Sequence, residues 1–423
     1  MNPQIHYNTE KAIKERIRLI IMKEETSKVY FMNARAKKFE ESIIEKTKRL
    51  FDEAGFSECI EKGDKVAIKV HFGELNSTRY LRPSIVRCVV EKVKEAGGDP
   101  FVCETQTVHA GPWASRITAQ DLLRNAAAHG FTAETVGCPI IPADGWIGDD
   151  DIIVPIDGHI LKKIYVAKAI ALADAMIVIS HTYLNTMGVT GSIKKVGVGC
   201  ISKRGKYLLH YELPKYPKLS VAPEKCLGLN CKWATICENS CPMGAIKISE
   251  KIEIDHNKCN MCGICVWICQ FLAQRYAVYH KRDKAALNVL RIADSAAGVL
   301  KCFENGKVGY FNYMFDIIGP LCECYPWSDI PLLPDIGILA SKDIVAIDAA
   351  ALEMLLNTAR NVGKESEINS FLNVNPFILI EKAEELMLGS RKFELIEVDP
   401  VFIPPQSKVP YLRRVFKKWS LNF

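Results

Sequence analysis

Short apolar runs alternate with amphipathic stretches along most of the chain. Three runs, at 65–73, 100–105 and 175–180, predict strands, and the last is apolar enough to be buried on both faces. Residues 83–96 repeat apolar side chains at helical spacing, with Pro83 at the start. This alternation predicts an α/β fold, with a mostly parallel sheet flanked by helices.

The same alternation continues after residue 280. Strands are expected at 307–315 and 335–340, and helices at 284–302 and 377–387. A further helix, with apolar residues from 344 to 356, follows Ser341. We expect the Ser341 hydroxyl to cap it, because serine readily accepts a hydrogen bond from a first-turn N–H group.

Prolines and a change in composition divide the chain into parts. Pro214, Pro217 and Pro223 precede a cysteine-rich stretch, which we interpret as a small ferredoxin-like α+β insert. The expected order is an N-terminal extension (1–27), the first part of the α/β domain (28–218), the insert (219–280), the second part of the α/β domain (281–400) and a basic tail (401–423). The tail is either solvated or in contact with RNA or anionic lipid.

The sharpest motif lies in the second half of the insert. Cys259, Cys262, Cys265 and Cys269 have the spacing C-x2-C-x2-C-x3-C, which is the ligand pattern of bacterial ferredoxins. Three cysteines of such a run bind one iron-sulfur cluster, and the fourth binds the other cluster where two are present. A disulfide framework is the alternative, although disulfides at this density are typical of small secreted domains.

A less regular cysteine group forms the first half. Counted back from Cys241, Cys237 and Cys231 fall at the third and first ligand positions, and Ala234 takes the second. Cys226 can replace the missing ligand if the loop bulges back. Crossed ligation then predicts two 4Fe-4S clusters, one held by Cys241, Cys259, Cys262 and Cys265 and the other by Cys226, Cys231, Cys237 and Cys269. One full cluster beside a three-ligand or degenerate site is the alternative.

Composition and charge limit the size of the core, the kind of partner and the cellular compartment that we expect. A chain of 423 residues, 48% of them hydrophobic, can bury more than one core. Its net charge of 55 − 49 = +6 is mild, so it permits an acidic partner without requiring one. No apolar run approaches the ~20 residues of a membrane span, and no secretory signal is visible. Sixteen cysteines with cluster spacing favour the reducing cytoplasm.

A glycine-rich, basic segment follows the strand at 175–180. Open α/β sheets bind ligands beyond the carboxyl ends of their strands, where glycines let backbone N–H groups approach an anion. We therefore expect an anion-binding loop for a cofactor or substrate, with charge supplied by Lys194, Lys195, Lys203 and Arg204. A solvated loop whose glycines only make turns is the alternative. No P-loop or dinucleotide fingerprint is present.

Several short motifs resemble the "domain of unknown function 362" family over roughly 28–388. They are Lys69-Val-His71-Phe-Gly-Glu74, Glu104-Thr105, Gly191-x-Ile-Lys194, Gly197-x-Gly199-Cys200, Cys322-x-Cys324 and Ser341-Lys-Asp-x-Val-Ala-x-Asp348. The resemblance implies that a ferredoxin insert is common at this position, but it implies no reaction. Family members often have Lys-Gly-His where this chain has Tyr183-Leu-Asn185, and Lys-Asn where it has Lys194-Lys195. A different ligand, or lost activity, would follow if that run belongs to an active site.

Polar residues outside the insert suggest a further centre. Cys200, Cys322 and Cys324 could hold a third iron-sulfur or metal centre, with His71, His181 and His210 as additional candidate ligands. Glu74, Glu104 and Asp335 are candidate acid-base or metal carboxylates. The alternative is that these cysteines are simply buried.

Together these patterns predict an iron-sulfur redox protein. Electrons would pass from a soluble partner protein through two 4Fe-4S clusters to a site on the α/β domain, where a small anionic substrate could be reduced. An electron carrier without a catalytic site is one alternative, and an iron-sulfur sensor or nucleic-acid-binding protein is another. Nucleic acid is disfavoured, because no helix-turn-helix or aromatic-basic repeat is visible.

Overall fold

The computed structural model describes residues 26–108, 114–211, 220–241, 243–259, 265, 268–275, 277–279, 283–319 and 323–402. The expected N-terminal extension and basic tail lie almost entirely outside these residues. Two predicted cluster or metal ligands, Cys262 and Cys322, lie outside them as well.

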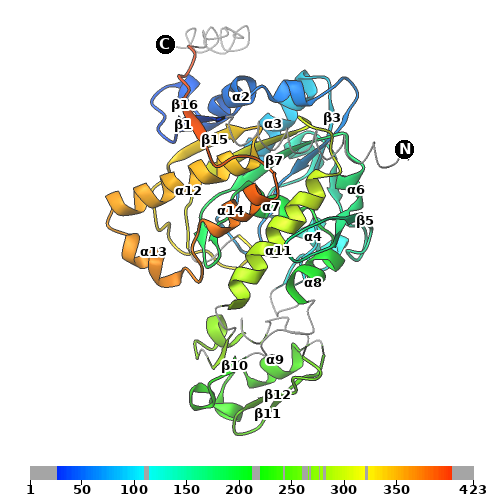
Figure 1. Cartoon of the computed structure of the whole chain (residues 1–423), viewed down its shortest axis with the longest axis vertical. Coiled ribbons are helices and arrows are strands. Elements are labelled where there is room, and N and C mark those ends of the chain that lie inside the picture. Colours follow the sequence, from blue (N-terminus) through cyan, green and yellow to red (C-terminus); the bar gives the residue numbers. More distant parts are fainter. Residues whose placement is uncertain are drawn as a thin grey trace, which may run out of the picture.

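An eight-stranded sheet forms the centre of the described α/β domain (Figure 1). In spatial order its strands are β16 (Phe393–Glu397), β1 (Ser27–Asn33), β15 (Gly337–Ser341), β14 (Val308–Met314), β7 (Ala175–His181), β2 (Lys65–Lys69), β3 (Asp99–Glu104) and β4 (Ile140–Pro142). The five strands from β14 to β4 are parallel, whereas β15 runs antiparallel to both of its neighbours. The prediction of a mostly parallel α/β sheet is therefore confirmed.

The order of the strands reverses beside β2. From β2 the chain moves outward to β3 and then β4, and it later returns to place β7 on the opposite side of β2. In open α/β sheets, such a reversal leaves a crevice outside the carboxyl ends of the two diverging strands. The segments that follow β2, β3 and β7 therefore become the walls of a natural ligand site.

Helices cover both faces of the sheet. One core packs α2 (Ile43–Glu53), α3 (Pro83–Glu95) and α4 (Ala119–Ala128) against one face. The other core lies beneath α7 (Ser192–Gly199), α8 (Lys203–Tyr211), α11 (Asp283–Leu300), α12 (Ile344–Asn361) and α14 (Ile378–Glu385). The remaining helices are α5 (Ala133–Val136), α6 (Lys168–Ala171) and α13 (Glu365–Phe371), and short hairpins pair β5 (Asp151–Pro155) with β6 (Lys163–Ala167) and β8 (Leu184–Asn185) with β9 (Gly188–Val189).

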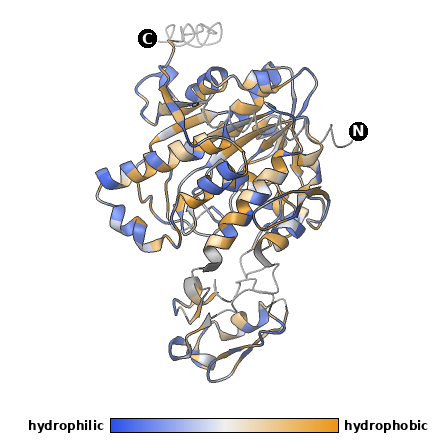
Figure 2. Ribbon diagram, in the orientation of Figure 1, coloured by the Kyte–Doolittle hydropathy of each residue, from blue (hydrophilic) through white to orange (hydrophobic). Residues whose placement is uncertain are grey.

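The continuous apolar run of β7 follows from its central position. Ile177 and Ile179 point into the core beneath α2 and α3, while Met176 and Val178 point into the core beneath α7 and α11. Figure 2 shows the corresponding pattern, with apolar strands inside and polar helix faces outside. A strand that is buried on both faces is apolar on both faces, which explains why apolar and polar residues do not alternate along β7.

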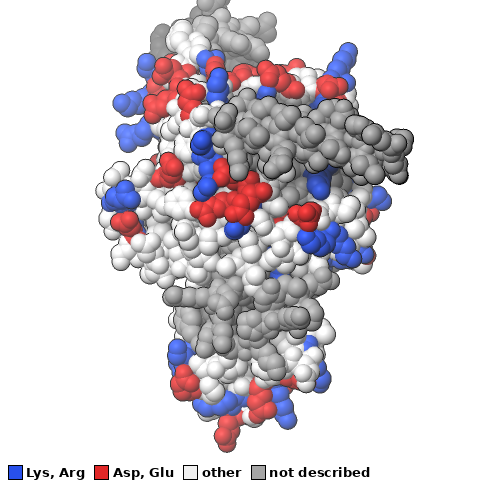
Figure 3. All heavy atoms as spheres, in the orientation of Figure 1, with Lys and Arg blue, Asp and Glu red and all other residues white. Residues whose placement is uncertain are grey.

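The cysteine-rich segment forms a small unit between α8 and α11 (Figure 1). Its ends pair as β10 (Ser220–Val221) and β13 (Val278–Tyr279), and a hairpin joins β11 (Ile246–Ile248) to β12 (Ile252–Ile254). Together with α9 (Ala234–Asn239), these strands enclose a separate core made of isoleucines and cysteines. On the face of the molecule drawn in Figure 3, acidic and basic side chains are interspersed over the described residues.

Two local predictions were wrong. The glycine-rich basic segment forms the helices α7 and α8 instead of a loop. Helix α12 is capped by Asp343, which accepts hydrogen bonds from Val345 N (2.8 Å) and Ala346 N (2.9 Å). Ser341 instead donates a hydrogen bond to the carbonyl oxygen of Lys28 on β1 (2.7 Å), because it still belongs to β15.

Candidate functional site

Short elements of the insert hold its cysteines in place. Cys226 follows the turn η3 (Pro223–Lys225), and Cys231 follows the turn η4 (Gly228–Asn230). Cys237 lies on α9, and Cys269 lies in the helical turn η5 (Ile268–Leu272). The two motif halves therefore approach one another from opposite ends of the insert.

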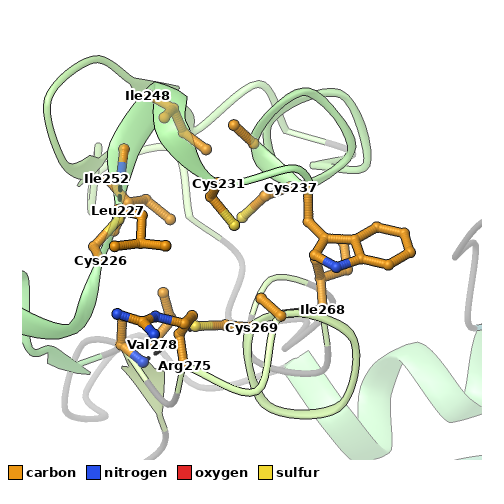
Figure 4. Close-up of a pocket in the computed structure, with 15 residues that line it drawn as sticks. Cys226, Leu227, Cys231, Cys237, Ile248, Ile252, Ile268, Cys269, Arg275 and Val278 are labelled. Carbon is orange, nitrogen blue, oxygen red and sulfur yellow. Dashed lines mark hydrogen bonds between the residues drawn. The ribbon is translucent and has the colours of Figure 1, made fainter.

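These four cysteines line one cavity. Cys226, Cys231 and Cys237 come from the first half of the motif and Cys269 from the second, and Figure 4 shows all four around the same space. Most of the remaining lining is apolar and includes Leu227, Ile248, Ile252, Ile268 and Val278. The cavity thus combines sulfur donors with walls that limit access of water.

Backbone N–H groups point at three cysteine sulfurs of the insert. Gly228 N donates to Cys226 Sγ (3.4 Å), Ala245 N to Cys241 Sγ (3.2 Å) and Ala277 N to Cys269 Sγ (3.1 Å). Arg275 also lines the cavity, and its Nε donates to the carbonyl oxygen of Lys225 (3.1 Å). Hydrogen bonds and positive charge at such positions stabilise negative charge on sulfur.

Three further cysteines among the described residues of the insert belong to the same small core. Cys265 is one of its buried members, and Cys241 and Cys259 pack against it. Burial, with smaller contributions from Cys269, Cys226, Cys231 and Cys241, raises the pKa of the Cys237 thiol to about 12. The described sulfurs are therefore close enough to influence one another's ionisation.

The chemistry of this donor set is that of an iron-sulfur site. In the part of the chain that the structure describes, no group of three or more His, Cys, Asp or Glu is placed to hold a single metal ion. Four cysteines line the cavity instead. Thiolates around an apolar space are the usual surroundings of a 4Fe-4S cluster.

A second cavity lies where the strand order reverses. It is bounded by the segments after β2, β3 and β7, by α7 and α8, and by the segment that precedes β15. Its charged lining residues are His71, Glu104, Arg116, Lys194, Lys195, Lys206 and Glu323, and Tyr183, Thr190 and Cys324 also line it. The structure thus brings together residues that are far apart in the sequence.

Buried ion pairs organise this cavity. Lys69 Nζ donates to Glu104 Oε1 (2.8 Å), and Lys195 Nζ donates to Glu323 Oε1 (2.8 Å). Burial alone would raise the pKa of both carboxyl groups. Lys69 nevertheless holds the pKa of Glu104 at about 2, and Lys195 lowers the pKa of Glu323 well below its usual range. Both carboxylates are therefore ionised.

His71 is a neutral imidazole in this setting. Burial, and then the nearby Arg116, lower the pKa of His71 well below its usual value. The Nδ1 atom accepts a hydrogen bond from Gly73 N (2.9 Å), so the proton resides on Nε2. His71 can thus present a hydrogen-bond donor to the cavity without adding charge.

The four basic residues expected to bind an anion separate into two pairs. Lys194 and Lys195 line the cavity. Lys203 instead donates to the carbonyl oxygen of Ile117 (2.7 Å), and Arg204 pairs with Asp151 and stacks on Tyr165. The two residues on α8 therefore serve internal contacts outside the cavity lining.

The predicted acid-base and histidine candidates also divide into residues that line the cavity and residues that lie away from it. Glu104 and His71 line the cavity, and Glu74 binds Arg116 (3.1 Å) behind it. His181 Nε2 bonds to the carbonyl oxygen of Phe315 (2.7 Å), and Asp335 accepts a hydrogen bond from Asp316 N (2.7 Å). The side chain of His210 lies outside the described residues.

The three cysteines expected to form a further centre are not seen together. Cys200 is fully buried in the core, where its sulfur contacts Met176 Sδ (4.0 Å). Cys324 lines the cavity and is disulfide-bonded. Cys322 lies outside the described residues. Among the described residues, therefore, only Cys324 of this set reaches the cavity.

Several residues of the family motifs have structural roles. Asp348 accepts hydrogen bonds from Ser192 N (2.7 Å) and Ile193 N (2.9 Å) at the start of α7. A side chain at Gly191 would collide with that carboxylate, since a Cβ atom there would lie 2.0 Å from Asp348 Oδ1. The N-terminus of α7, an expected place for a bound anion, is thus occupied by the protein's own carboxylate.

Among the charged residues of the cavity, sequence reasoning did not single out Arg116, Lys206 and Glu323. Glu323 was the easiest to find, because it is the middle residue of the Cys322-x-Cys324 motif. Lys206 ended the basic segment already singled out. Arg116 carried no local signal, since its place depends on the tertiary path of the segment after β3.

Fold and cavities together define a doubly wound α/β protein that carries a cysteine-lined insert. A family model described as "Domain of unknown function (DUF362)" matches residues 66–353, and the chain belongs to this family. The resemblance noted from sequence motifs is therefore confirmed.

Two further comparisons cover smaller parts of the chain. It is 51% identical over 45 residues to a protein of Methanosarcina acetivorans named as a subunit of an ion-translocating oxidoreductase complex, a match to 10% of this chain and 15% of that protein. The structure of the lactate racemase apoprotein from Thermoanaerobacterium thermosaccharolyticum aligns over 44% of this chain and 41% of that chain, with 14% identity and a TM-score of 0.28. In the described residues, no helix has the length and apolarity needed to span a membrane.

Proposed function

We propose that this protein is an iron-sulfur redox protein whose insert carries electrons to the cavity at the strand ends. Two 4Fe-4S clusters would supply one-electron chemistry. Cys226, Cys231, Cys237 and Cys269 hold one cluster, and Cys241, Cys259, Cys262 and Cys265 hold the other. The cavity of the α/β domain is the receiving site, where a small anion could be reduced.

The observation that carries this proposal is the position of Cys269. It comes last in the C-x2-C-x2-C-x3-C run, yet it lines the same cavity as three cysteines from the other half of the motif. Crossed ligation of this kind is typical of ferredoxins with two clusters. It also accounts for Cys226, which stands in for the ligand missing at Ala234.

Two further observations support a redox role. The relative that shares 51% identity over 45 residues is named as part of an oxidoreductase complex. Helix α8 also lies between the cavity and the insert in the order of the chain, since it brings Lys206 to the cavity and ends at Tyr211, before the insert begins. We infer a soluble partner protein as the source or acceptor of electrons and the cytoplasm as the setting.

The proposal is tested on the full-length protein purified without air. Electron paramagnetic resonance of the reduced sample should show two cluster signals. Cys226→Ser and Cys269→Ser should change the same signal, whereas Cys241→Ser and Cys265→Ser should change the other. Cys302→Ser, at a half-buried cysteine outside the insert, is the matched control. The crossed arrangement is excluded if Cys226 and Cys269 affect different signals.

A further inference from the structure

The cavity at the strand ends has an excess of positive charge. The ammonium groups of Lys69 and Lys195 are each paired with a buried carboxylate, and Arg116 Nε donates to Glu74 Oε2 (3.1 Å). Lys206 Nζ donates only to uncharged oxygens, Thr105 Oγ1 (2.6 Å) and the carbonyl oxygen of Gln106 (2.5 Å). Lys194 makes no hydrogen bond or ion pair within the described residues. Lys194 therefore remains to be neutralised by a ligand, and so in part does Lys206, whose charge is also offset by the buried Asp144 and by Glu104.

Two acceptor atoms of the same cavity lack a donor within hydrogen-bond geometry. Glu104 Oε2 lies 3.9 Å from Arg116 Nη1 and Glu323 Oε2 lies 3.5 Å from His181 Nδ1, and neither contact is a hydrogen bond. Glu104 is 1% exposed and Glu323 is 3% exposed. Their Oε2 atoms accept no hydrogen bond from the described residues. A buried carboxylate oxygen without a donor costs free energy, so a ligand that donates a hydrogen bond there gains affinity. A purely accepting anion, such as sulfate, offers the carboxylates no hydrogen bond and is repelled by them.

Size and net charge narrow the ligand further. The cavity measures about 110 Å³, and a single water needs roughly 10–15 Å³ by the same measure, so a small molecule fits. An amino acid with an uncharged side chain has donors, but its zwitterion is neutral overall and leaves the charge of Lys194 uncompensated. A hydroxylated carboxylate has both the negative charge and the donor.

We propose that this cavity binds a small hydroxycarboxylate, with its carboxylate on the Lys194 and Lys206 side and its hydroxyl donating to Glu323 or Glu104. His71 adds a neutral donor through Nε2. That such a ligand exchanges electrons with the insert rests on the proposed function, but the binding itself does not.

The test is calorimetric titration of the full-length protein, purified without air, with four matched probes. Malate has the hydroxyl, succinate lacks it, aspartate replaces it with an ammonium group that reduces the net negative charge, and inorganic sulfate is an anion without a hydrogen-bond donor. We expect malate to bind roughly ten-fold more tightly than succinate, which is the effect of one hydrogen bond to a charged acceptor. Aspartate and sulfate should bind more weakly than malate.

Single-residue variants test which charged side chains bind the ligand. Lys194→Met should weaken malate binding about ten-fold or more, whereas Lys162→Met, at an exposed lysine outside the cavity, should leave it unchanged. Glu323→Gln should reduce the preference for malate over succinate. The proposal is overturned if no probe binds, if succinate or sulfate binds as tightly as malate, or if folded Lys194→Met binds malate like the parent protein. If Lys194→Met does not fold, the preference of the wild-type protein for malate over succinate is the result that decides for or against the proposal.

Failure of this inference is distinguishable from failure of the proposed function. The visible absorbance and iron content of the same sample report the clusters. Malate selectivity in a colourless protein would overturn the redox proposal and keep the binding site. A protein that contains its clusters but binds none of the probes would overturn the proposed binding site and keep the redox proposal.

Discussion

Asp348 accepts a hydrogen bond from the backbone N–H group of Ser192 at 2.7 Å, and this contact fixes the first turn of α7 against α12. The carboxylate is completely buried, and Asn312 Nδ2 also donates to it (2.8 Å). Because α7 carries Lys194 and Lys195, this contact positions two residues that line the cavity. The motif residue Asp348 thus acts on the site through backbone geometry.

Removing this carboxylate should destabilise the domain. Asp348→Ala leaves the N–H groups of Ser192 and Ile193 buried without acceptors, at about 1–3 kcal/mol for each group. Urea unfolding at neutral pH should show the loss as a lower midpoint. Asp157→Ala is the matched control, since that side chain is 98% exposed, and it should change the midpoint little. A variant of Asp348 as stable as the parent protein would contradict this role.

The Lys69–Glu104 pair should be costly to break from one side. Both side chains are buried, with exposures of 0% and 2%, and truncating one partner of such a pair typically costs about 3–5 kcal/mol. We expect Lys69→Met to lose stability on this scale in thermal unfolding. The double variant Lys69→Met/Glu104→Gln should recover much of it, because neither member of this pair is then left charged without the other. Equal losses in the single and double variants would argue against the pair as the cause.

Arg275 should raise the reduction potential of the cluster that we place beside it. It lines the same cavity as Cys226 and Cys269, and a positive charge there favours the more negative, reduced cluster. Arg275→Gln should shift the midpoint to more negative values in a redox titration followed by electron paramagnetic resonance. Arg275→Lys should restore most of the parent value, and the exposed Lys247→Gln is the charge-removal control. An unchanged midpoint in Arg275→Gln would show that its charge does not reach the cluster.

Binding of an anion to the strand-end cavity should weaken at alkaline pH. Burial lowers the pKa of Lys194 to about 8, with Glu323 raising it and Lys195 lowering it further. Burial likewise lowers the pKa of Lys206 to about 8. Asp144 and Glu104 raise this pKa, and Arg116 and Lys69 lower it. Each amine is charged below its pKa and neutral above it. Malate affinity should therefore be highest below about pH 8 and fall above it.

The variant Lys194→Arg separates the two lysines in this titration. An arginine remains charged throughout the range, so the fall in affinity should become shallower and depend on Lys206 alone. Calorimetric titrations at a series of pH values measure both curves. A flat curve for the parent protein would show that neither amine titrates in contact with the ligand.

Local patterns predicted those parts of the fold that depend on local chemistry. The buried run of β7, and the helix α3 with Pro83 in its first turn, were both visible in the sequence. Helices α7 and α8 were missed because their glycines suggested a loop. Gly197 and Gly205 instead allow close packing, since a Cβ atom would lie 2.3 Å from Ile292 O and 2.8 Å from Tyr165 O, respectively. A glycine at a helix contact cannot be distinguished from a glycine in a turn without the partner surface.

The candidate sites were predictable to different degrees for a similar reason. The cysteine spacing is a local constraint, so it indicated which four sulfurs would share the cavity of the insert. The strand-end cavity is assembled from segments after three strands and from two helices, so only its glycine-rich and motif-borne members, such as Lys194 and Glu104, stood out. Arg116 became recognisable only after the order of the strands was known.

Iron and acid-labile sulfide counting on full-length protein purified without air tests the central claim most directly. Two 4Fe-4S clusters in the insert predict about eight irons and about eight sulfides per chain, together with broad visible absorbance. A colourless protein that contains neither iron nor sulfide would contradict the account.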